Sequence, residues 1–186
     1  MGGAIKSLKG QLLLDGGKLS GSFFHRAVVF VCQHDSEGAF GLIVNRPTEN
    51  TIQELSSEVI PESLEGTLVH VGGPVQPGAL SFLVADSHLD SDQIIPNVSL
   101  GHSFEHLIEL TEPFSAQREI RLFSGYSGWS PGQLDDEIQS GAWMIQPATR
   151  KLLFDHDANN LWRYIMYQQG WEERLLADSP DDLSTN

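Results

Sequence analysis

The sequence has one cysteine, few basic residues and no long hydrophobic run, and each shortage excludes a class of protein. The single cysteine, Cys32, cannot form a disulfide within the chain. No apolar run approaches the ~20 residues that a membrane-spanning helix needs. The opening segment MGGAIKSLKG also lacks the apolar stretch of a secretory signal. We therefore expect a cytoplasmic protein with no membrane partner.

Basic residues are scarce throughout the chain. There are 11 Lys and Arg against 25 Asp and Glu, which gives a formal net charge of −14. Proteins that bind nucleic acid gain most of their affinity by neutralising phosphates with Lys and Arg. The segment 86–112 has no basic residue, and its acidic residues are Asp86, Asp90, Asp92, Glu105, Glu109 and Glu112. This balance argues against direct nucleic-acid binding, and we interpret the excess acid as a source of solubility.

The pattern of short apolar runs and tight turns predicts an α+β fold. Strands are expected at 27–32, 42–44, 67–71, 80–85, 120–123, 142–145 and 152–154. Helices are expected at 51–57, in the second half of 99–110, and after the N-cap Asn160. Short strands interspersed with helices favour α+β over a regular βαβ winding. We expect one domain over residues 1–176 and an acidic flexible tail over 177–186.

The stretch from Ser124 to Gly141, SGYSGWSPGQLDDEIQSG, predicts a glycine-rich loop that leads into a capped helix. Ser130 and Gln133 have the spacing of a capping box, and Pro131 occupies the first helical position. Gly141 is placed for a left-handed C-terminal cap. The segment is neither a serine nucleophile elbow nor a phosphate loop, because Trp129 replaces the second glycine and no lysine follows.

The same stretch carries a family resemblance. GYSGWSPGQLDDEIQSGAW resembles the signature of the bacterial AlgH/YqgE family, and FFHRAVVFVCQHDSEGAFGLIVNRP and VHVGGPV are similar to two further blocks of that family. The resemblance runs from Leu8 to Trp171. The chain departs from the family's Ala-x-Pro pattern with Asp15-Gly16-Gly17. The resemblance implies an α+β fold whose mixed or antiparallel sheet closes into a small β-barrel with surrounding helices. It also implies a link to transcriptional regulation.

Six residues are candidates for a ligand site. Arg46 can form a bidentate pair with a carboxylate or phosphate, and the alternative is an internal ion pair with a carboxylate such as Glu137. Glycines can bring backbone amides close to a ligand, although such a segment can also simply turn the chain. The candidates are Asn45, Arg46, Gly72, Gly73, Tyr126 and Gln133. A ligand site is predicted if Arg46, Gly73 and Tyr126 converge on one open cleft.

A metal site is the alternative. His102, Glu105 and His106 match the H-x-x-E-H pattern, in which two histidines bind zinc and a glutamate acts as base. Ser103, however, has the character of a helix N-cap, which would place His102 outside the helix. Asp86, His88 and Asp90 alternate along an extended segment and are a weaker ligand set. Cys32 lies in an apolar run and is interpreted as buried filling.

No nucleophile with a base, and no other ligand set, assembles from these patterns. We therefore expect a non-enzymatic binding or regulatory protein that contacts another protein or a small ligand, and we expect no cofactor. The alternative is a zinc-dependent hydrolase that uses His102, Glu105 and His106.

Overall fold

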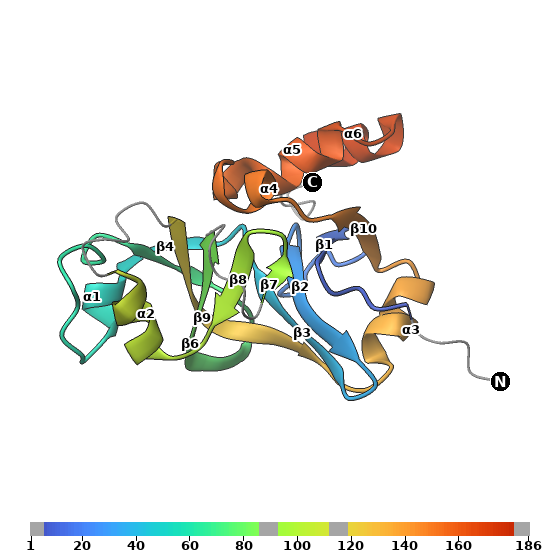
Figure 1. Ribbon diagram of the computed structural model, residues 1–186. Coiled ribbons are helices and arrows are strands. Elements are labelled where there is room, and N and C mark those ends of the chain that lie inside the picture. The colour runs from blue at the N-terminus through green and yellow to red at the C-terminus, as the bar shows by residue number, and fades with distance from the viewer. Residues whose placement is uncertain (1–5, 86–92, 112–118, 181–186) are drawn as a thin grey trace.

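The computed structural model describes residues 6–85, 93–111 and 119–180, and a curled β-sheet forms its centre (Figure 1). The strands are β1 (Gln11–Asp15), β2 (Val28–Asp35), β3 (Gly38–Ile43), β4 (Pro47–Thr51), β5 (Leu68–Val71), β6 (Val75–Ala85), β7 (Gln93–Ile95), β8 (Val98–Gly101), β9 (Glu119–Trp129) and β10 (Trp143–Pro147). The helices are α1 (Ile52–Leu55), α2 (Phe104–Leu110), α3 (Gln133–Gln139), α4 (Arg150–Phe154), α5 (Leu161–Tyr167) and α6 (Trp171–Asp178), and a 3₁₀ turn, η2 (Ala158–Asn160), precedes α5.

The main path of the sheet follows the order β10-β1-β2-β3-β9-β6-β8-β7, and β5 joins it beside β9 with β4 outside it. Neighbouring strands are antiparallel except for β5 and β9, which are parallel, so the predicted mixed α+β fold is confirmed. The sheet curls so that its two ends approach each other. A Cβ built on Gly10, which precedes β1, would lie 2.9 Å from Cγ2 of Ile95 in β7. Among the described residues no ladder joins β7 to β10, so the curled sheet is a half-barrel.

The apolar part of β2, Val28 to Cys32, is buried on both faces, as its continuous apolar sequence predicts. Phe30 packs with Trp162 and Ile165 of α5 on one face. Val29 points the other way and packs with Trp143. The alternation of side chains along a strand therefore divides the apolar residues of β2 between two cores.

A second region of core lies under α1 and α2. Ile52 of α1 and Leu107 of α2 pack with Phe82 and Leu122 of the sheet. Figure 1 shows these two helices side by side at one end of the molecule, with α3 at the other end and α4, α5 and α6 together over one side. None of the helices within 6–85, 93–111 and 119–180 is long and apolar enough to cross a membrane.

The expected loop at Ser124 is wrong, because residues through Trp129 belong to β9. Gly125 adopts φ 72°, and the strand continues past it to pair with β3. The helix begins at Gln133 with Gly132 as its N-cap, not at Ser130. Half of the expected capping box remains, since Gln133 Oε1 accepts from the Ser130 N–H at 3.1 Å. The left-handed Gly141 after the helix is confirmed at φ 71°.

Two further expectations are corrected near the C-terminus. The predicted strand 152–154 is part of α4, and β10 pairs with β1 rather than forming a hairpin with it. Thr149 supplies the N-cap of α4, with its hydroxyl accepting from the Leu152 N–H at 3.2 Å. Ala177 and Asp178, which the sequence places in the tail, belong to α6, and Ala177 is buried. Residues 181–186 lie outside the described part of the chain.

Candidate functional site

Two of the predicted site residues, Asn45 and Arg46, line a cleft of about 340 Å³ between the strand ends and the α5 region. The described residues that line it are His25, Arg26, Asn45, Arg46, Asn159, Asn160, Trp162 and Arg163. We call this site the arginine cleft. Its side chains come from three separate parts of the chain: the end of the β1–β2 loop, the segment after β3, and η2 with the first turn of α5.

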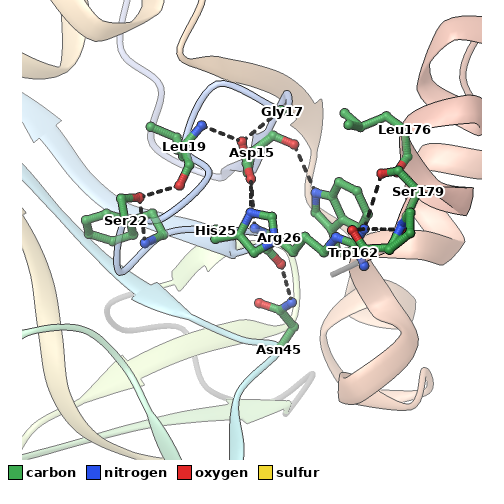
Figure 2. A network of polar contacts seen from close by, with 12 residues as sticks. Asp15, Gly17, Leu19, Ser22, His25, Arg26, Asn45, Trp162, Leu176 and Ser179 are labelled. Carbon is green, nitrogen blue, oxygen red and sulfur yellow. Dashed lines mark hydrogen bonds and ion pairs between the residues drawn. The ribbon is translucent and has the colours of Figure 1, made fainter. Parts of the chain in front are cut away.

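The carboxylate of Asp15, at the end of β1, contacts two lining residues of the arginine cleft, His25 and Arg26 (Figure 2). Asp15 is fully buried, and its Oδ1 accepts from the N–H groups of Gly17 at 2.8 Å and Leu19 at 3.2 Å. Its Oδ2 accepts from the Arg26 N–H at 2.8 Å, and His25 Nδ1 lies 3.5 Å from the same oxygen. A buried carboxylate requires such partners, so Asp15 shapes the loop that presents His25 and Arg26.

Asn45 is a structural bridge as well as a lining residue. Its Oδ1 accepts from the Val28 N–H at 2.7 Å, and its Nδ2 donates to the Arg26 carbonyl at 2.9 Å. The side-chain amide thus continues the ladder where β2 and β3 diverge. It also supports Arg26 in the left-handed conformation at φ 53°, which non-glycine residues rarely adopt.

The three arginines have different partners. Arg26 Nη2 donates to the Ser179 carbonyl at 2.6 Å, and its guanidinium lies 5.0 Å from the centre of the Trp162 ring. Arg46 Nη2 donates to the His25 carbonyl at 3.1 Å, and its guanidinium lies 4.9 Å from the Phe23 ring. Arg46 forms no ion pair with any carboxylate of the described chain. Arg163 is exposed at the other side of the cleft.

Burial leaves the charges of two arginines poorly solvated. Desolvation lowers the pKa of Arg46. Desolvation also lowers the pKa of Arg26, and the positive charge of Arg163 lowers it further, while Asp15 acts in the opposite direction. Guanidinium groups remain charged at neutral pH despite such shifts. Since no acidic residue is among the described lining, the cleft presents a net positive charge in a strongly acidic protein.

Comparison with known proteins decides the family. A model of the family described as AlgH-like matches residues 12–174. The chain belongs to the AlgH-like family. A UPF0301 protein of Chlorobium luteolum is 35% identical over 177 residues, covering 92% of this chain and 91% of the relative. One of Streptomyces avermitilis is 33% identical over 187 residues, covering 98% of this chain and 97% of the relative.

Two solved structures share the fold of this AlgH-like chain. The solution structure of AlgH from Pseudomonas aeruginosa has a TM-score of 0.74 and 24% identity, covering 97% of this chain and 98% of that one. The crystal structure of a protein from Corynebacterium diphtheriae has a TM-score of 0.75 and 18% identity, covering 96% and 95%. These likenesses establish the half-barrel fold.

The glycines of the AlgH-like motifs join strands and do not line the arginine cleft. A Cβ on Gly72 would lie 2.3 Å from the Gly125 carbonyl oxygen, and one on Gly73 would lie 2.1 Å from the Tyr126 carbonyl carbon. The Gly72 N–H donates to the Ser124 carbonyl at 2.9 Å. Tyr126 itself packs against Phe40, with ring centres 5.0 Å apart. The described lining of the cleft that holds Arg46 therefore includes neither Gly73 nor Tyr126.

Gln133 and Glu137 belong to a separate network at α3. Gln133 Nε2 donates to Glu137 Oε1 at 2.9 Å. Glu137 Oε2 accepts from the indole N–H groups of Trp129 and Trp143, each at 2.8 Å. The alternative of an ion pair between Arg46 and Glu137 is therefore wrong, because the partners of this carboxylate are Gln133 and two tryptophans of the family signature.

The alternative metal ligands do not converge. His102 lies before α2, where its Nδ1 is 3.0 Å from Ser81 Oγ, whereas His106 packs against the Phe82 ring. Glu105 accepts instead from the hydroxyl of Ser103, the N-cap of α2, at 2.7 Å. No group of three potential metal ligands occurs in the described ranges. The weaker set Asp86, His88 and Asp90 lies outside them.

Sequence reasoning missed most of the arginine cleft. Arg26, Trp162 and Arg163 were not among the candidates, and Trp162 is buried. One sequence feature pointed weakly to the cleft: in a chain with only 11 basic residues, Arg26 and Arg46 each lie close to the end of a buried strand. Only the packing of α5 against this end of the sheet adds Arg163.

Proposed function

We propose that the chain is a cytoplasmic, non-enzymatic binding protein that takes up a small anion in the arginine cleft. The observation that carries this proposal is the presence of Arg26, Arg46 and Arg163 around one cleft without an acidic residue in its described lining. Arginine recognises phosphate and carboxylate groups through paired N–H donors. The ligand class is therefore a small molecule bearing phosphate or several carboxylates.

Electrostatics support an anion as the occupant. Like charges that share a cleft repel, and burial weakens their solvation, as the lowered pKa values of Arg26 and Arg46 reflect. An anion bound between these arginines would offset their mutual repulsion and replace the solvation that burial removes. A bound anion should stabilise the charge of Arg46 most, because Arg46 forms no ion pair within the described chain.

The dimensions of the cleft favour a compact ligand. A volume of about 340 Å³ lies at the lower end of ordinary ligand pockets. Trp162 does not offer a free stacking surface, because it is buried and Arg26 covers its ring. The recognised part of the ligand is thus its anionic group and not an aromatic ring.

The chemistry of the lining favours binding over catalysis. The described lining consists of arginine, asparagine, histidine and tryptophan side chains, with no serine, cysteine or carboxylate to act as nucleophile. A role in transcription would then operate through the bound ligand or a protein partner. The net charge of −14 disfavours direct contact with DNA.

Titration of the folded protein tests this proposal. We expect inorganic phosphate, pyrophosphate or citrate to shift the amide resonances of Arg26, Arg46 and Arg163 in a saturable way. Arg46→Gln and Arg163→Gln should each weaken binding by about tenfold, as expected for loss of one charge-assisted contact. Arg174→Gln on α6, outside the cleft, is the matched control. The proposal fails if all three anions leave the cleft resonances unchanged, or if the control weakens binding equally.

A further inference from the structure

Charge is distributed very unevenly along the chain. From Pro47 through Gln117 the sequence holds 11 acidic residues and no Lys or Arg. All 11 basic residues, with 14 acidic ones, lie in the rest of the chain. We call the described part of the Pro47–Gln117 segment, which includes α1 and α2, the acidic lobe.

The carboxylates of the acidic lobe around α1 are exposed and unneutralised. None of them forms an ion pair with a described residue, and Glu54 Oε2 accepts hydrogen bonds from the Thr51 N–H at 2.7 Å and the Thr51 hydroxyl at 3.2 Å. Between residues 47 and 66, the exposed acidic residues are Glu49, Glu54, Glu58, Glu62 and Glu65. Such a single-sign surface attracts cationic partners and accelerates their association.

A groove of about 430 Å³ opens in the same lobe, between α1 and β6. Its described lining is uncharged and includes Ile52, Leu55, Val69, Pro77, Gly78 and Leu80. The groove follows from an irregularity in the sheet. Between the pairs Val75–Tyr126 and Leu80–Ser124, β6 has four residues where β9 has one, so residues 76–79 bulge away from the ladder.

Two features leave the groove open to an apolar group. Leu55 is 53% exposed although it sits beside the buried Ile52 on a four-residue helix. A Cβ built on Gly78 would meet no atom within 4 Å. Exposed apolar surface with a polar rim is typical of interaction sites.

We propose that this groove docks a basic segment of a partner protein, which inserts an apolar side chain between α1 and the β6 bulge. Lysine or arginine residues beside that anchor would pair with the exposed glutamates of the acidic lobe, such as Glu54 next to Leu55. At many interfaces, an anchor side chain in a desolvated pocket contributes much of the binding energy, and the contacts around it contribute less. A second copy of this chain is a poorer occupant, because the rest of the chain is itself net acidic and each copy carries a charge of −14.

The test uses the full chain and fluorescent synthetic peptides, followed by anisotropy and amide resonances. We expect Lys-Lys-Leu-Leu-Lys-Lys to bind in a salt-sensitive way and to shift Ile52, Leu55 and Gly78. The same peptide with serine in place of leucine should bind at least about tenfold more weakly. A peptide with glutamate in place of lysine should not bind. Equal binding of the leucine and serine peptides would overturn the proposal.

Variants locate the binding site. Gly78→Leu should fill the groove and reduce binding of the leucine peptide by about tenfold or more. Gly66→Leu is the matched control in the same lobe, because a Cβ there also meets nothing within 4 Å. Leu55→Ser is a second test should Gly78→Leu not fold. Unchanged binding in both Gly78→Leu and Leu55→Ser would overturn the proposal, as would self-association of the free chain that Gly78→Leu abolishes. Because the groove is separate from the arginine cleft, the anion titration can succeed or fail independently.

Discussion

The Arg26 guanidinium lies 5.0 Å from the centre of the Trp162 ring, and this contact joins the β1–β2 loop to α5. Trp162 adds a hydrogen bond from Nε1 to the Asp15 carbonyl at 3.0 Å. Arg26 extends the connection to the end of α6 through the Ser179 carbonyl. One wall of the arginine cleft is therefore also the attachment point of the C-terminal helices (Figure 2).

The Arg26–Trp162 contact should be measurable as a coupling energy. In a double-mutant cycle of Arg26→Gln and Trp162→Leu, unfolded by urea, we expect a coupling of about 0.5–1 kcal/mol. Arg174→Gln combined with Trp162→Leu should be additive, since the two side chains share no contact. Additive behaviour in the first cycle would show that the stacking contributes nothing.

Asp15→Asn should destabilise the protein by about 2–3 kcal/mol. The amide keeps the shape of the side chain but replaces one acceptor oxygen by a donor that faces backbone N–H groups, and it removes the buried charge that they stabilise. Urea unfolding measures the loss. Glu172→Gln, at an exposed position of α6, is the control and should change stability by less than about 0.5 kcal/mol. A similarly small effect at Asp15 would contradict its role as the support of the loop.

Gly73→Ala should prevent folding or destabilise it by about 3 kcal/mol or more. The added Cβ would meet the Tyr126 carbonyl carbon at 2.1 Å and the Ser127 nitrogen at 2.4 Å, and these backbone atoms have little room to relax. Gly66→Ala, at an open position, should be tolerated. Thermal unfolding followed by circular dichroism compares the two variants. Equal melting temperatures would contradict the close contact between Gly73 and the Tyr126 backbone.

His70 should make the protein less stable as the pH falls below neutrality. Burial, and then the charge of Arg121, lower the pKa of His70 from 6.5 to about 4. Between these values the unfolded chain binds a proton and the folded chain does not. The free energy of unfolding therefore falls as pH decreases from 6.5 to 4, by up to about 1.4 kcal/mol per pH unit.

The His70→Gln variant isolates this contribution. Urea unfolding across the same pH range should show a shallower decline for the variant than for the parent, whatever their absolute stabilities. Parallel curves would mean that other groups cause the acid sensitivity.

Cys32 should be inert towards a disulfide thiol reagent in the native protein. Burial strongly raises the pKa of its thiol, so little thiolate is present, and the side chain is 2% exposed in the core. Reaction should become rapid after unfolding in urea. Fast reaction of the folded protein would contradict its placement in β2.

Sequence reasoning located the elements whose signals are local. The N-cap Ser103 and the helix after Asn160 were both expected and are confirmed. It was wrong at Ser124–Trp129, where glycines suggested a loop. These glycines instead allow β9 to cross close to Gly72 and Gly73, a contact with a distant segment that local propensity does not record.

Composition and local pattern by themselves determined the lack of an internal disulfide, the uneven charge, the α+β class and the family resemblance. Tertiary structure alone decided that Arg46 lines one cleft with Arg26 and Arg163, and that Glu137 binds two tryptophans instead of Arg46. The physical reason is the distance along the sequence between the residues that interact. Helix caps and strand alternation depend on neighbours in sequence, whereas the cleft depends on the curl of the sheet and the docking of α5, which join residues far apart along the chain.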